Sequence, residues 1–100
     1  MDMEERYRLI ISTILNAIGC KVEVEHMLST GRIDIVASTS RFIYVVELKL
    51  TNNGGLEAAE KQIISNGYLK PFLADGRKVI GLAVELDDMG KGLIDWKEVK

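Results

Sequence analysis

The segment 42–50, with the sequence FIYVVELKL, constrains the fold of this chain more than any other segment. Aromatic and β-branched residues dominate it, and such residues favour β-strands. Because side chains alternate between the two faces of a strand, one face here is wholly apolar: Phe42, Tyr44, Val46, Leu48 and Leu50. The other face carries Ile43, Val45, Glu47 and Lys49. The segment therefore predicts a buried strand with a carboxylate and an ammonium at the end of one face.

Hydrophobic periodicity predicts helices and further strands on both sides of this strand. Apolar residues recur at helical spacing over 3–18 and 56–66, and a glycine that can end a helix follows each segment. Strand patterns cover 21–28, 32–38, 79–84 and 93–96. The predicted fold is α/β, an αβββαβ core in which two helices flank a mixed central sheet, plus a terminal strand.

Length and composition predict one domain spanning residues 1–100. The chain has 100 residues, of which 47% are hydrophobic, enough for one core and too few for two. Its apolar runs are far shorter than the ~20 residues that a membrane span needs, and we find no cleavable signal. The single Cys20 has no partner for an internal disulfide. We expect a cytoplasmic protein that does not enter the membrane.

Asp34 lies on the same sheet face as Glu47 and Lys49 only for one register of the predicted hairpin between 32–38 and 42–50. With an even-numbered loop over 38–41 and Ala37 opposite Phe42, Asp34 pairs with Val45 and shares its face with Glu47 and Lys49. An odd-numbered loop would turn Asp34 to the opposite face. The hypothesis of a shared site therefore depends on hairpin register.

Two converging carboxylates are hard oxygen ligands, as Mg²⁺ prefers, and a nearby lysine can orient or deprotonate a water. On a helical wheel Glu4 lies within the apolar arc of the first helix and faces the body of the protein. The alternative is structural: Glu47 and Lys49 form an exposed ion pair, and Asp34 starts a strand beside a turn. An isolated Glu-x-Lys pattern is weak evidence by itself, so its context has to decide.

The chain resembles the PD-(D/E)XK nuclease superfamily, in the branch that typically forms the C-terminal domain of bacterial proteins with an AAA-ATPase-like N-terminal region. The likeness covers nearly the whole chain. It rests on these segments in this order: Glu4-Glu5-Arg6-Tyr7, Glu25, Gly31-Arg32-Ile33-Asp34, Ile43 to Lys49, Glu57-Ala58-Ala59, Gln62-Ile63, Gly67-Tyr68, Asp75-Gly76-Arg77-Lys78 and Trp96. Ile33 occupies the place of the proline of the motif.

The resemblance implies that the αβββαβ core is restriction-endonuclease-like, and it implies a role for each site residue. Asp34, Glu47 and the Leu48 carbonyl would bind Mg²⁺ or Mn²⁺, and Glu4 would complete or support the metal site. Lys49 would position the attacking water or stabilise charge on the phosphate, and Gln62 would border the site. The implied function is metal-dependent hydrolysis of phosphodiester bonds in nucleic acid, with DNA as the expected substrate.

Charge argues for a second hypothesis. The net charge is −2, and Lys and Arg are scattered, so the chain lacks the basic stripe usual in nucleic-acid binders. DNA contacts would then need a homodimer or an attached ATPase domain. The alternative function is a catalytically weak or inactive module for oligomerisation or for regulation of that ATPase. A third option is a nucleic-acid binder without hydrolysis.

Five other residues are predicted to have structural roles. His26 has no second ligand at zinc spacing, so it is expected at a sheet margin. Asp87 and Asp88 are expected in a hairpin turn. Glu25 is expected to pair with Arg32 across the adjacent turn, and Trp96 to anchor the core or its edge.

Overall fold

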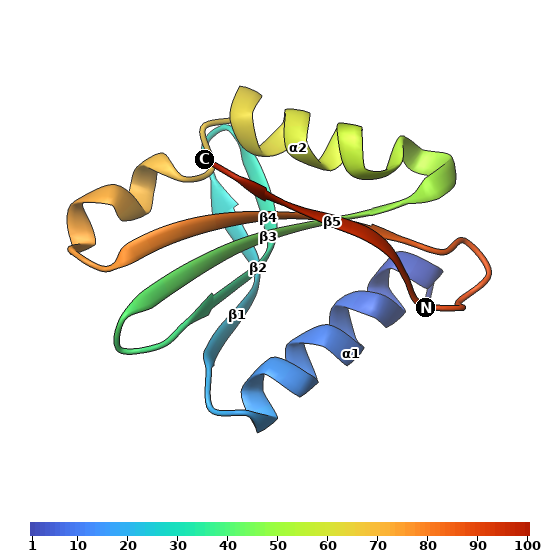
Figure 1. Cartoon of the computed structure of the whole chain (residues 1–100), viewed down its shortest axis with the longest axis horizontal. Coiled ribbons are helices and arrows are strands. Elements are labelled where there is room, and N and C mark those ends of the chain that lie inside the picture. The colour runs from blue at the N-terminus through green and yellow to red at the C-terminus, as the bar shows by residue number, and fades with distance from the viewer.

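The computed structural model describes residues 1–100 as a five-stranded sheet with one α-helix on each face (Figure 1). Along the chain the elements are α1 (Met3–Ala17), β1 (Lys21–Leu28), β2 (Gly31–Ser38), β3 (Phe42–Leu50), α2 (Gly55–Ser65), β4 (Lys78–Leu86) and β5 (Leu93–Val99). Short 3-10 helices cover Thr51–Asn53 and Lys70–Asp75. This is the predicted restriction-endonuclease-like αβββαβ core with a terminal strand; the prediction had assigned the second 3-10 segment to a loop.

The sheet is mixed, as predicted, and its strands lie in the order β1-β2-β3-β4-β5. Neighbouring strands are antiparallel except for β3 and β4, which run parallel. A parallel pair needs a crossover connection, and α2 supplies it across one face of the sheet. Strand β3 lies at the centre of the sheet, with two strands on each side of it, as expected for its largely apolar sequence.

The register of the β2–β3 hairpin differs from the prediction by two residues. Ala37 pairs with Tyr44, not with Phe42. The turn is tighter than expected because the Thr39 hydroxyl accepts from the amides of Arg41 and Phe42, while the Thr39 amide donates to the Phe42 carbonyl. A shift of two residues keeps every side chain on its face.

Helix α1 covers one face of the sheet and is fastened at its N-terminal end. Asp2 caps the helix by accepting from the Glu5 amide at 2.8 Å. Tyr7, the one fully buried residue of the helix, donates its hydroxyl to the Asp87 carbonyl and accepts from the Gly92 amide. These bonds tie α1 to the β4–β5 loop, where the prediction of a turn at Asp87 is confirmed.

Helix α2 covers the other face and begins at two glycines with positive φ, Gly54 and Gly55. A Cβ on Gly55 would lie 2.6 Å from the Glu85 carboxylate, so only glycine fits here. Glu85, on β4, accepts hydrogen bonds from the Leu56 amide and the Thr51 hydroxyl. Ala59 and Ile63 then face the sheet and are buried against it.

The Tyr68 side chain is wholly buried after α2 and joins that helix to the start of β2. Its hydroxyl donates to the Arg32 carbonyl at 3.1 Å and accepts from the side-chain amides of Gln62 and Asn66. Gly31 lies so close that an added Cβ would be 2.6 Å from the hydroxyl oxygen. Tyr68 thus fixes the backbone two residues before Asp34.

The face that carries α1 is only partly covered. An apolar groove of about 660 Å³ lies between α1 and β5. It is lined by Ile11, Leu15, Ile18, Cys20, Thr39, Tyr44, Val46, Leu48, Leu82, Val84, Leu93 and Trp96. Trp96 is 58% exposed on the edge strand β5, so of its two predicted places, in the core or at its edge, the core is excluded. Neither α1 nor α2 has the length and apolar character that a membrane crossing requires.

Replacing Tyr68 by Phe should lower the free energy of unfolding by ~1–2 kcal/mol, because it leaves the Arg32 carbonyl and two side-chain amides without their partner. Urea denaturation measures the change. Tyr44→Phe is the matched control, since the Tyr44 hydroxyl makes no hydrogen bond within the chain, and it should change stability little. Equal effects of the two substitutions would contradict the role given to the Tyr68 hydroxyl.

Candidate metal centre

The candidate site lies where the β2–β3 ladder ends. The last backbone pair of the ladder is Ile35 with Val46, so the next step places Asp34 opposite Glu47. There the Asp34 carboxylate replaces the backbone as acceptor, and the Leu48 amide donates to it at 2.8 Å. In an extended strand the N–H and C=O of one residue point to the same side. The Leu48 carbonyl is therefore also directed toward β2.

Glu47 is the most unusual residue of the site. It is 2% exposed, and its Oε1 atom is buried without a hydrogen-bond partner. Its Oε2 atom lies 3.9 Å from Lys49 Nζ, too far for a hydrogen bond. A buried carboxylate oxygen without a donor costs free energy unless it is protonated or binds a cation. It is the one buried side-chain oxygen or nitrogen of the chain that lacks a hydrogen-bond partner, so a proton or a cation is needed to stabilise it.

The environment of the two acids disfavours their ionisation. Burial, followed by the charge of Asp34, raises the pKa of Glu47 to about 8, although Lys49 opposes the shift. Burial also raises the pKa of Asp34, against the lowering effects of the Leu48 amide and of the Arg8 and Lys49 charges. Two carboxylates in one site with raised pKa values share a proton readily, and a divalent cation can take the place of that proton.

Glu4 approaches the site from the first turn of α1, as its wheel position predicted. Burial and then the charge of Asp34 raise the pKa of the Glu4 carboxyl, so it lies within electrostatic reach of the site. No group of three or more His, Cys, Asp or Glu side chains in the chain is close enough together to hold a metal ion. Glu4 is thus a neighbour of the Asp34 and Glu47 pair, and its role as a ligand stays a prediction.

Gln62 lies on α2, and its side chain contacts Tyr68. Its side-chain amide donates to the Tyr68 hydroxyl at 3.1 Å, and that hydroxyl in turn contacts the Arg32 carbonyl. Gln62 therefore supports the strand that carries Asp34, and this contact is what the structure shows of it. Its predicted place beside the reacting groups stays a prediction.

Sequence reasoning missed Arg8. Its side chain is 14% exposed, and its guanidinium lies 3.8 Å from an Asp34 oxygen and bonds to Glu25 at 2.8 Å. The predicted pair of Glu25 with Arg32 is present at 3.6 Å but is the longer of the two. Helical spacing could have predicted its position. Arg8 follows Glu4 by one turn, so both side chains lie on the same side of α1.

The residues fit a divalent cation of the magnesium type. Mg²⁺ is usually bound by one or two carboxylates and keeps several waters. Asp34 and Glu47 supply two carboxylates, and the Leu48 carbonyl is a third oxygen on the same side. The unpartnered Glu47 oxygen is the observation that supports this fit, since a cation would satisfy it.

One comparison with known proteins gives a match. The family model of the PD-(D/E)XK nuclease superfamily matches residues 2–96, which includes every residue of the candidate site. No curated protein matches the chain.

The metal-free chain should lose stability as the pH rises from about 4.5 to about 8. Between the ordinary pKa of a glutamate, 4.5, and the Glu47 pKa of about 8, the folded state binds more protons than the unfolded state, so each step up in pH favours unfolding. Glu47→Gln removes this ionisation and should be the more stable protein above pH 8, by ~1–3 kcal/mol.

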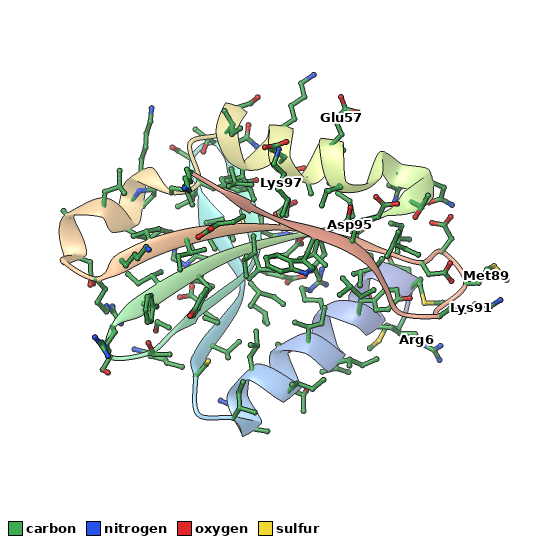
Figure 2. All side chains as sticks on the ribbon, in the orientation of Figure 1. Arg6, Glu57, Met89, Lys91, Asp95 and Lys97 are labelled. Carbon is green, nitrogen blue, oxygen red and sulfur yellow. The ribbon has the colours of Figure 1, made fainter.

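Urea unfolding in EDTA across this pH range measures the effect. Glu57→Gln, on the exposed side of α2, is the matched control and should follow the unmodified chain (Figure 2). If the curves of Glu47→Gln and the unmodified chain run parallel across the whole range, Glu47 does not carry the buried ionisation assigned to it.

Proposed function

Because the chain belongs to the PD-(D/E)XK nuclease superfamily, we propose that it hydrolyses phosphodiester bonds in nucleic acid, with DNA as the substrate, using Mg²⁺ or Mn²⁺. One observation carries the proposal: the buried Glu47 oxygen beside Asp34 has no partner of its own. A purely structural glutamate in this place would be expected to have a donor. The structural alternative of an exposed ion pair between Glu47 and Lys49 is wrong, since Glu47 is buried.

Each residue of the site has a distinct task in this proposal. Asp34 and Glu47 hold the cation together with the Leu48 carbonyl, and Glu4 completes or supports the site from α1. The cation supplies Lewis-acid chemistry, acidifying a water and neutralising charge on the phosphate. Lys49, whose side chain is 22% exposed, orients the attacking water or stabilises charge on the phosphate. Gln62 borders the site through its contact with Tyr68.

The charge of the chain bears on how substrate would be bound. With a net charge of −2 and no basic stripe, the chain alone offers little of the electrostatic attraction that dominates nucleic-acid affinity. A second copy of the chain or an attached ATPase domain would supply the missing contacts. The site would then cleave DNA that another surface presents to it. In this proposal the protein acts in the cytoplasm.

A second candidate function is a module for oligomerisation or for regulation of an attached ATPase. The observation that favours it is the apolar groove beside β5, where Leu93 and Trp96 are both more than half exposed. Large exposed apolar patches mark interaction sites in soluble proteins. In this case the nuclease fold would be retained as a scaffold. An inert, self-associating chain would support this candidate over the nuclease.

The nuclease proposal predicts that Asp34→Asn lowers cleavage of plasmid and single-stranded DNA by at least ~100-fold in Mg²⁺ or Mn²⁺, since a direct ligand should matter at least as much as its outer partners. Asparagine is chosen because its amide oxygen can still accept from the Leu48 amide, which alanine would leave unsatisfied. The measurement is a time course of cleavage on gels at equal protein concentration.

Asp95→Asn is the matched control. Asp95 lies on the exposed strand β5 (Figure 2), and its replacement should leave cleavage unchanged. Equal cleavage by Asp34→Asn and the unmodified chain would refute hydrolysis at this site. No cleavage by any of the three proteins, with or without a partner domain, would favour the interaction module.

A further inference from the structure

Arg8 places a positive charge next to the carboxylate that would hold the cation. One nitrogen of its guanidinium lies 2.8 Å from Glu25 Oε1, the usual length of a charge-assisted hydrogen bond. Another nitrogen lies 3.8 Å from Asp34 Oδ1, which is beyond hydrogen-bond range. The guanidinium is therefore directed to Glu25 and only neighbours Asp34.

Glu25 is held in place by an unusual backbone conformation. It is the one non-glycine residue of the chain with positive φ, at 54°. The residues on either side of it are paired with β2: Val24 with Ile35, and His26 with Ile33. Glu25 therefore lies opposite Asp34, at a position where the β1–β2 ladder is interrupted. A side chain in this conformation costs of order 1 kcal/mol, and such residues persist where their surroundings require them.

A second arginine, Arg32, also lies near Glu25. Arg32 lies 3.6 Å from the same Glu25 oxygen, so the carboxylate is shared between two guanidinium groups. A small polar hollow borders this cluster, lined by Asp2, Glu4, Glu5, Arg8, Glu25 and Arg32. Because acids outnumber bases in the lining, the hollow is suited to a cation and not to a phosphate, and Arg8 is better placed to act as a counter-ion than as a phosphate anchor.

We propose that Glu25 is a positioning residue that holds the Arg8 guanidinium partly away from Asp34, and that this distance sets the affinity of the site for divalent cations. The inference rests on the proposed function, because it concerns the same cation. Without a cation, Arg8 partly neutralises Asp34. With a cation present, Arg8 opposes it, and Glu25 limits that opposition by binding the guanidinium.

The test measures Mn²⁺ binding by isothermal titration calorimetry, using MnCl₂ and no nucleic acid. Arg8→Gln removes the opposing charge and should bind Mn²⁺ about tenfold more tightly than the unmodified chain. Glu25→Gln frees Arg8 to move onto Asp34 and should bind about threefold more weakly. Arg6→Gln is the control, because Arg6 lies on the same helix and points away from the sheet (Figure 2), and it should bind as the unmodified chain does.

The double variant Arg8→Gln with Glu25→Gln decides whether Glu25 acts through Arg8. If it does, Glu25→Gln has no effect once Arg8 is gone, and the double variant binds as tightly as Arg8→Gln. If the threefold weakening persists in the double variant, Glu25 acts directly on the cation and the proposal is overturned. Arg8→Met, which keeps the aliphatic stem in place, replaces Arg8→Gln in the cycle if the latter is poorly folded.

Failure of this inference can be told from failure of the proposed function. Binding by the unmodified chain that Arg8→Gln leaves unchanged overturns the role of Arg8 and leaves the metal site standing. Binding by Arg8→Gln where the unmodified chain binds too weakly to detect supports the proposal. Absence of Mn²⁺ binding in all variants overturns the metal site and, with it, this inference.

Discussion

The hydrogen bond from the Leu48 amide to the Asp34 carboxylate joins the fold of this chain to its chemistry. It stands where the β2–β3 ladder ends, and it brings a carboxylate into the interior in place of a backbone carbonyl. Once Asp34 is held there, Glu47 on the facing strand is buried next to a like charge, which raises its pKa. Two carboxylates buried side by side are costly to the folded state, and a divalent cation bound between them would offset part of that cost.

Sequence reasoning predicted the order of elements because the relevant signals are local. The alternation of β3 and the glycines after both helices depend on neighbours in the chain, and the structure confirms them. The hairpin register was predicted two residues out, because it depends on hydrogen bonds of the Thr39 hydroxyl within the turn. The proximity of Asp34 to Glu47 and Lys49 survived this error because the shift was even.

Other parts of the site could not be predicted because they arise from contacts between distant segments. The pairing of Arg8 with Glu25 joins α1 to β1, and the packing of these two separate segments is not encoded in a local pattern. The positive φ of Glu25 likewise follows from the interruption of the β1–β2 ladder opposite Asp34. Trp96 is a large apolar residue of the kind found in cores, yet the chain leaves it 58% exposed. The sequence alone does not distinguish an apolar residue that the chain itself buries from one that a partner would bury.

The most direct test of the account is a crystal soaked in MnCl₂, with anomalous diffraction recorded to locate the ion. The account predicts one strong peak between Asp34 and Glu47, about 2.0–2.2 Å from the Glu47 oxygen that now lacks a partner, with the Leu48 carbonyl directed at it. A map with no peak there, and with that oxygen bonded to a water or a protein donor, would contradict the metal site and leave the fold as the only established feature.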